Sequence, residues 1–175
     1  MVEVCLGNPH KLNYQWKTLC DEVYTLMKKS VKMGGKLRVY STMAKPALGA
    51  EDVMVYIVPN EEMSRVAEHF NVRDESDALG CTYTGDQSAS EVYIAGEYAD
   101  EKLPPDYVAK LIWHEIAHNK SKLGNHKMHR GKGLLQSFVR SRNSLESDDI
   151  KFMRKHLNAH VRQWTGGFDF SAPPM

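Results

Sequence analysis

The chain has 175 residues, of which 42% are hydrophobic and 26% are charged, and its formal net charge is +1. This length and composition are typical of one soluble globular domain, and the near-neutral charge excludes a general attraction to nucleic acid, membranes or acidic substrates. Three cysteines are too few for a disulfide framework or a four-cysteine zinc ribbon.

Export and membrane signals are not expected from this sequence. Residues 1–8 lack the basic segment and apolar run of a signal peptide, and no apolar stretch approaches the length that spans a bilayer. An odd number of cysteines also fits a reducing compartment. We therefore expect a cytoplasmic protein without a membrane segment.

Apolar periodicity and turn residues predict one domain, residues 1–164, followed by an irregular tail at residues 165–175. In chain order the predicted elements are a helix at 13–33, strands at 36–41 and 53–58, a helix at 60–70, strands at 80–84 and 91–98, and helices at 106–122, 133–142 and 147–164. Asn60 and Ser147 are the expected N-caps of their helices, and Gly124 follows the end of the helix at 106–122. This order of elements indicates an α+β fold class.

Two histidines and a glutamate in the predicted helix 106–122 have the spacing of a metal-dependent hydrolase. His114 and His118 are four residues apart, so both imidazoles project from one helical face and can reach the same ion. Catalytic zinc sites bind such nitrogens at about 2.0–2.1 Å and leave one position open for water. Glu115 can take a proton from the attacking water and pass it to the leaving amine. The segment therefore predicts one Zn²⁺ ion and a peptide-hydrolysing centre, with Glu115 as general base and acid.

A second pair of histidines, His156 and His160, has the same four-residue spacing. Leu157 stands where the motif around His114 has its glutamate, so this pair lacks a general base. We interpret it as part of the surface or core of the last helix, with a second metal site as the alternative.

A catalytic zinc needs a third protein ligand, for which the sequence offers several candidates. His126 and His129 lie beyond the end of the predicted helix, where the chain can turn back over the metal. The nearest acidic residues downstream are Glu146 and Asp148, either of which could complete the site instead. The residues alone leave these alternatives open.

The order of these features resembles the SprT-like metallopeptidases, the group that includes Spartan. It consists of a strand at 91–98, the histidine–glutamate helix, and a histidine shortly before another predicted helix, and the resemblance covers residues 13–143. It implies a zincin-like fold, in which a leading helix and a small mixed sheet precede the active-site helix and further helices follow. An edge strand of that sheet is expected beside the active-site helix.

The resemblance also bears on the third ligand. In the family that histidine is commonly followed by glycine and, three residues later, by an aromatic side chain. The corresponding segment here begins at His129, with Arg130 inserted before the glycine and Leu134 where the aromatic is usual. The resemblance therefore implies His129 as third ligand, ahead of His126 and then Glu146.

Substrate contacts are expected on the strand that precedes the motif. Zincins commonly bind an extended substrate along an edge strand, by main-chain hydrogen bonds. The candidate residues on the strand at 91–98 are Val92, Tyr93 and Ile94. A second electrophile for the developing oxyanion is also expected, and its candidates are Tyr93, Tyr98, Arg130 and Arg140.

The segment from Lys120 to Arg142 contains seven basic residues and no acidic one. Because the resemblance implies action on proteins attached to DNA, this segment could contact phosphates, with a solvated basic face as the alternative. Phe138 is its only aromatic residue, so stacking on unpaired bases has little support.

Three classes of function fit these features. The leading hypothesis is a zinc metallopeptidase that cleaves protein or peptide substrates. The alternatives are a non-catalytic zincin-fold protein that binds nucleic acid or protein, and a zinc hydrolase of non-peptide amides. Glu115 favours an enzyme, because a binding fold needs no general base at that position.

Overall fold

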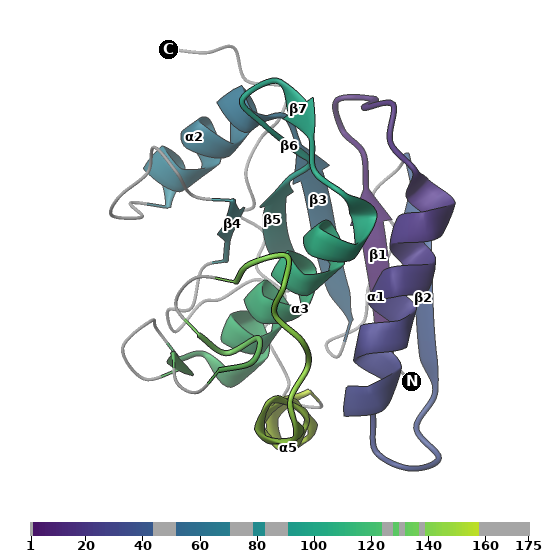
Figure 1. Ribbon diagram of the computed structural model, residues 1–175. Helices are drawn as coiled ribbons and strands as arrows, with labels where there is room; N and C mark the ends of the chain where they lie inside the picture. Colours follow the sequence, from purple (N-terminus) through teal and green to yellow (C-terminus); the bar gives the residue numbers. More distant parts are fainter. Residues whose placement is uncertain are drawn as a thin grey trace.

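The computed structural model describes residues 2–43, 52–70, 79–82, 91–123, 128–129, 132–136 and 139–157 (Figure 1). The described strands are β1 (Val2–Gly7), β2 (Leu37–Thr42), β3 (Val53–Val58), β4 (Gly80–Cys81), β5 (Glu91–Ala95), β6 (Glu97–Tyr98) and β7 (Glu101–Lys102). The described helices are α1 (Trp16–Ser30), α2 (Asn60–His69), α3 (Pro105–Ser121) and α5 (Ser147–His156). These elements confirm the predicted α+β class.

A five-stranded mixed sheet forms the centre of the fold, with strand order β2-β1-β3-β5-β4. The pairs β1–β2, β1–β3 and β3–β5 are parallel, whereas β4 runs antiparallel to β5 at one edge. Strands β6 and β7 form a separate hairpin, whose turn residues Ala99 and Asp100 both have positive φ, 48° and 65°. The hairpin leads directly into α3.

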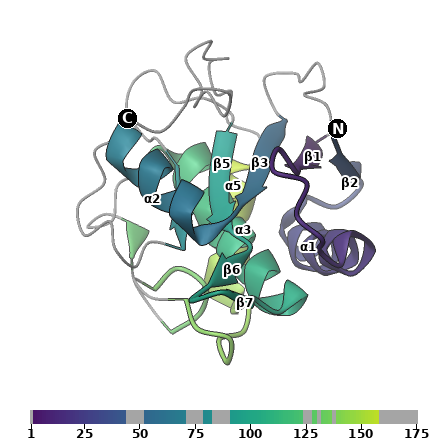
Figure 2. The ribbon, with the colours of Figure 1, turned by 90° about the horizontal axis from the view of Figure 1, so that it is seen from above.

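Alternating side chains of the sheet build two hydrophobic cores, one on each face. Val55, Ile57 and Ile94 belong to the core that includes α1 and α3, while Tyr56 and Tyr93 face the core that includes α2. Figure 2 shows α1 and α3 on the same side of the strands. Because both faces are covered, the central strands are continuous apolar runs rather than alternating ones.

Among the described helices, α3 is the most buried, and the residues at its two ends account for where it starts and stops. Pro105 occupies the first helical position, where a missing N–H costs nothing. Lys122 adopts a left-handed conformation (φ 55°) and ends the helix two residues before Gly124, the predicted terminator. Trp113, fully buried, donates its Nε1–H to Oγ of Ser30 over 3.1 Å and joins α3 to α1.

Several predicted elements are confirmed and others need correction. The strand at 53–58 is confirmed to the residue, whereas β1 was not predicted at all. The run at 91–98 is divided at Gly96 into β5 and β6, which belong to different sheets. The predicted helix at 133–142 is wrong for its described residues, which form turns and irregular chain.

The predicted helix ends are also shifted. Pro59 precedes α2, so Asn60 is the first helical residue and not the N-cap. Glu146, rather than Ser147, is the N-cap of α5, and it forms a capping box with Asp149. Helix α1 is shorter than the predicted 13–33.

Some predictions fall outside the described residues, namely the last part of the predicted helix 147–164, from residue 158 on, and the tail at 165–175. Within the described ranges, no helix combines the length and apolar character that crossing a membrane requires.

Candidate metal centre

Three histidine side chains meet at the C-terminal half of α3. His114 and His118 project from the helix, and His129 comes from the chain that follows it. The Nε2 atom of His118 lies 3.1 Å from Nε2 of both other histidines, and Nε2 of His114 lies 3.3 Å from Nε2 of His129. His114 and His118 are buried, at 6% and 4% exposure, and His129 is half-buried.

Main-chain carbonyl groups orient two of the three rings. Nδ1 of His114 lies 2.6 Å from the carbonyl oxygen of Leu134, and Nδ1 of His118 lies 2.8 Å from that of Leu123. A carbonyl oxygen only accepts hydrogen bonds, so in both rings the proton is on Nδ1. The Nε2 lone pairs of His114 and His118 are therefore free to bind an ion, the arrangement usual for metal-ligating histidines.

The spacing of the three nitrogens suits a tetrahedral metal ion. Nitrogens that bind zinc at about 2.0–2.1 Å with tetrahedral angles are about 3.3–3.4 Å apart, close to the 3.1–3.3 Å found here. Lone pairs that face one another at this distance repel, and a cation between them removes the repulsion. The three histidines can therefore hold a metal ion, and imidazole ligands alone do not choose among zinc, copper, iron and nickel.

Burial also keeps these rings in the form that binds metal. Desolvation lowers the pKa of His114 to about 4, and desolvation together with the nearby His114 lowers the pKa of His118 to about 3. Both rings are therefore neutral at pH 7, so binding a metal need not displace a proton from Nε2.

These shifts predict acid destabilisation of the metal-free protein. Between pH 6.5 and about 4 the unfolded chain binds protons at His114 and His118 that the folded protein does not bind. The contribution of these two histidines to the free energy of unfolding should therefore be fully present above pH 6.5 and should be lost as the pH drops toward 4. Urea denaturation in the presence of a chelator measures this dependence.

The titration of Glu115 changes the free energy of unfolding in the opposite direction, so the test needs a variant that lacks this carboxylate. Its burial raises the pKa of the carboxyl group to about 8, and the folded protein then holds a proton that the unfolded chain releases above pH 4.5. The variant Glu115→Gln should therefore show a steeper loss of stability below pH 6.5 than the wild type. A flat profile in that variant would contradict the predicted neutral histidines.

The Glu115 side chain lies against the edge strand β4. A Cβ atom on Gly80 would be 2.8 Å from Cγ of Glu115 and 2.9 Å from its Oε1. Only glycine allows the strand to pass so close to the carboxylate. The half-buried Glu115 side chain is thus enclosed between its own helix and β4.

Asn119, which the sequence did not indicate, links α3 to Thr82, the residue that follows β4. Its Nδ2 donates to Oγ1 of Thr82 over 3.0 Å, and that hydroxyl donates to the carbonyl oxygen of Glu91 over 3.0 Å. Asn119 is fully buried on α3 directly after His118. An amide directly after His118 was the available signal in the sequence, but its hydrogen-bond partners are distant along the chain.

The predicted substrate strand needs correction. Val92, Tyr93 and Ile94 are at most 1% exposed, and β5 lies between β3 and β4 rather than at an edge. The edge strand beside α3 is β4. A continuous apolar run is typical of an interior strand, so the sequence itself argues against substrate binding along residues 91–98.

The other candidate electrophiles lie in different surroundings. The hydroxyl of Tyr93 donates to Oε2 of Glu91 over 2.8 Å and belongs to the core on the α2 face. Tyr98 is 43% exposed on the separate hairpin, and Arg140 is exposed. Arg130 is outside the described residues.

The alternative third ligands are not part of the histidine cluster in the described chain. Glu146 is exposed at the start of α5 and accepts a hydrogen bond from Ser144 over 2.9 Å. Asp148 is exposed and pairs with Lys151 over 3.2 Å. His126 lies outside the described residues.

The second histidine pair is also separate from this centre. His156 packs on the ring of Phe152, with 4.7 Å between the centroids, and is not a member of the cluster. His160 is outside the described residues. The interpretation of His156 as a packing residue agrees with this contact.

The predicted basic segment does not form one uniform surface. Lys120 is 1% exposed and therefore buried in the protein, whereas Lys122, Lys132, Arg140 and Arg142 are exposed. Lys127 and Arg130 lie outside the described residues. A phosphate contact by this segment would depend on its exposed members.

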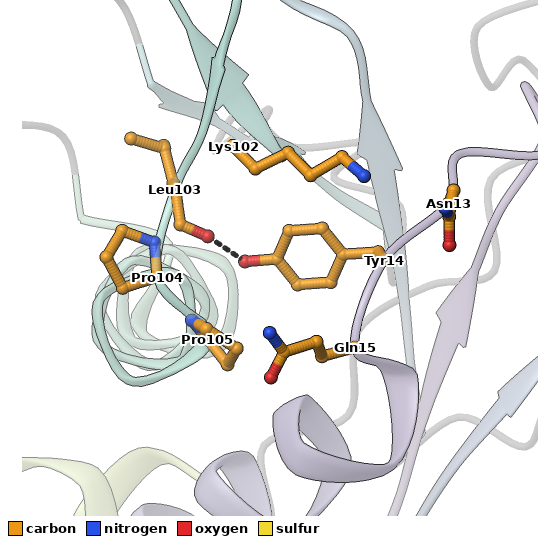
Figure 3. Close-up of a pocket in the computed structure, with 7 residues that line it drawn as sticks. All are labelled: Asn13, Tyr14, Gln15, Lys102, Leu103, Pro104 and Pro105. Atoms are coloured by element: carbon orange, nitrogen blue, oxygen red, sulfur yellow. Dashed lines mark hydrogen bonds between the residues drawn. The ribbon is translucent and has the colours of Figure 1, made fainter.

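A small pocket lies at the opposite end of α3. It has a volume of about 220 Å³, and Tyr14 donates a hydrogen bond from its hydroxyl to the carbonyl of Leu103 there (Figure 3). Pro105 also lines it, and His114 lies nine residues further along the helix, which corresponds to about 14 Å. The pocket is therefore separate from the metal centre.

No protein-family model matches the chain, and a comparison with curated proteins finds no match. Function must therefore be inferred from the residues of the site and from their geometry.

Proposed function

We propose that the protein is a zinc-dependent metallopeptidase of the zincin type, similar to the SprT-like group. The observation that carries this proposal is the convergence of three histidine Nε2 atoms within 3.1–3.3 Å, with Glu115 directly beside the first ligand on the same helix. A metal site with a purely structural role is usually closed by four protein ligands and needs no carboxylate in this position.

Each residue of the centre has a defined role in peptide hydrolysis. His114, His118 and His129 would hold the zinc ion, and the carbonyl groups of Leu134 and Leu123 keep the rings of His114 and His118 in the required tautomer. When bound, zinc makes water more acidic and polarises the substrate carbonyl. A cation held by the three histidines would lower the pKa of Glu115 from its metal-free value of about 8, because it favours the ionised carboxylate. The carboxylate of Glu115 then accepts the proton of the attacking water and delivers it to the leaving amine.

The position of β4 supports a peptide as substrate. This strand is at the edge of the sheet and runs past Glu115 at Gly80. An extended peptide that adds to this edge by main-chain hydrogen bonds would bring its own backbone close to the carboxylate. The fold therefore supports a zincin-like binding mode on β4 in place of the predicted strand at 91–98.

Gly80→Ala is expected to lower the rate of hydrolysis by about 10- to 100-fold, because a small displacement of a catalytic group costs about that much. The added methyl group would be 2.8–2.9 Å from the Glu115 side chain and would displace the carboxylate. Zinc content should stay unchanged, since the three atoms nearest to the added methyl group all belong to Glu115 and none to a histidine. Steady-state kinetics and metal analysis of the purified variant test both statements.

A matched control for this variant exists at Gly96. A Cβ atom there would be 2.8 Å from Cγ2 of Ile57, an equally close contact with an apolar residue outside the site. Gly96→Ala should lower stability but leave kcat near the wild-type value. If both alanine variants lose activity equally, the Gly80 contact has no specific role.

The proposal as a whole is tested by metal analysis and an assay on an unfolded protein substrate. We expect one zinc ion per chain, cleavage that a chelator abolishes, and recovery when zinc is added back. The assay is run with and without DNA, because Lys132, Arg140 and Arg142 are exposed. Zinc binding without any cleavage would instead favour a non-catalytic zincin-fold binding protein, and failure to bind zinc would refute the proposal.

A further inference from the structure

Asp149, in the first turn of α5, is a buried carboxylate surrounded by main-chain donors. It is 3% exposed, and its Oδ2 accepts the N–H of Leu134 over 2.8 Å and that of Glu146 over 2.8 Å. Its Oδ1 accepts the N–H of Leu135 over 3.2 Å. Charged acceptors of this kind form stronger hydrogen bonds than neutral ones, so the carboxylate restrains the segment that donates to it.

The same segment orients a metal ligand. The N–H of Leu134 points to Asp149, while its carbonyl oxygen accepts the Nδ1–H of His114 over 2.6 Å. The residues at 132–136 are in neither a helix nor a strand, so no regular hydrogen-bond ladder holds the Leu134 carbonyl in place. Instead, the carboxylate of Asp149 accepts the N–H groups of Leu134 and Leu135, which a ladder would otherwise pair with carbonyl groups.

Packing at Gly133 shows how closely the segment wraps around the carboxylate. A Cβ atom on Gly133 would be 1.9 Å from Oδ2 of Asp149 and 2.7 Å from its Cγ. Any side chain at this position must therefore displace either the segment or the carboxylate of Asp149. The sequence Gly133-Leu134-Leu135 thus allows the backbone to approach the acid directly.

We propose that Asp149 is a positioning residue of the metal centre, which fixes the tautomer and orientation of His114 through the peptide group of Leu134. This inference rests on the metal site of the proposed function, but it does not depend on peptide hydrolysis. Partners one step beyond the ligands typically change metal affinity by 10- to 100-fold. Asp149 acts through one further peptide group, so we expect about a tenfold effect.

The test compares Asp149→Asn with Asp148→Asn. Both variants remove one negative charge from the same helical turn, but Asp148 is exposed and makes no contact with the Leu134 segment among the described residues. Zinc affinity is measured by competition with a chelating dye. The dissociation constant of Asp149→Asn should rise about tenfold, while that of Asp148→Asn should stay within twofold of the wild type.

A spectroscopic measurement reads the orientation of His114 without any metal. In the chelator-treated wild type, ¹⁵N NMR of the imidazole nitrogens should show the Nδ1–H tautomer for His114. The Asp149→Asn variant should show a larger Nε2–H fraction, and Asp148→Asn should not. General destabilisation of a folded protein would not select one tautomer of one ring.

A second variant keeps the proposal testable if Asp149→Asn does not fold. Gly133→Ala changes the other partner of the contact between the segment and Asp149. It should reproduce the weaker zinc binding and the altered His114 tautomer, whereas Lys132→Ala, at an exposed neighbouring position, should not. Wild-type zinc affinity and an unchanged His114 tautomer in Asp149→Asn or Gly133→Ala would overturn the proposal. A wild type that binds no zinc would refute the proposed function, while the tautomer measurement would still decide the role of Asp149.

Discussion

Glu115→Gln is expected to reduce hydrolysis by about 100- to 10⁴-fold, the usual contribution of a general acid–base group. Glutamine keeps the size and polarity of the side chain but cannot accept a proton from water. Zinc should remain bound with wild-type affinity, because the cluster of ligand nitrogens consists of His114, His118 and His129. The measurement is kcat on an unfolded protein, with zinc content determined on the same sample.

Two further expected results would show that the effect is specific to the Glu115 carboxylate. Glu101→Gln changes an exposed carboxylate on the β6–β7 hairpin and should leave kcat unchanged. The glutamine variant at position 115 should also be at least as stable as the wild type above pH 8, because burial penalises the ionised carboxylate. Full activity in Glu115→Gln would show that another group accepts the proton.

His129→Ala is expected to lower zinc affinity by more than 100-fold, since removal of a direct ligand must exceed the effect of outer partners. The loss of zinc binding should also appear as a smaller stabilisation of the folded protein by zinc. At a zinc concentration 100 times the dissociation constant of the wild type, binding stabilises the wild type by about 2.7 kcal/mol, and the variant should gain almost nothing. Thermal denaturation with and without zinc measures the difference.

The controls for this variant are two other histidines. His156→Ala removes a ring that packs on Phe152 and should keep wild-type zinc affinity. His126→Ala tests the alternative ligand, and we expect it to keep the metal as well. Zinc affinity that is lost in His126→Ala but retained in His129→Ala would reassign the third ligand.

Helix α3, which carries His114 and His118, was predictable because the residues that indicate it lie close together in the sequence. Pro105 marks the start of α3, and His114 and His118 share a face through the helical repeat alone. The strand at 53–58 was equally clear, because its unbroken apolar run ends at Pro59. The features that could be read from the sequence are thus the ones that depend on neighbours within a few residues.

The parts that were missed depend on distant partners. Residues 2–7 contain a glutamate and a cysteine, and they become a central strand only because β2 and β3 pair with both edges. At 133–142 the apolar spacing is typical of a helix. The backbone groups of Leu134 bond instead to His114 and Asp149, which excludes the ordinary helical pattern. No pattern within a few residues of Leu134 indicates that its backbone groups bond to His114 and Asp149 rather than within a helix.

The parallel pairings of the sheet have a consequence for the order in which the protein folds. Val2 pairs with Leu37, and Val4 with Val53, so long loops must close before either contact forms. Folding dominated by such distant contacts is slow, whereas a helix such as α3 forms from local contacts. His129 and Leu134 are only 11 and 20 residues from their partners on α3, so the metal centre closes shorter loops than the sheet and should form first. In stopped-flow refolding we expect zinc uptake to precede the main change in tryptophan fluorescence, because Trp113 reports the packing of α3 against the distant helix α1. Zinc uptake that follows this change would exclude this order.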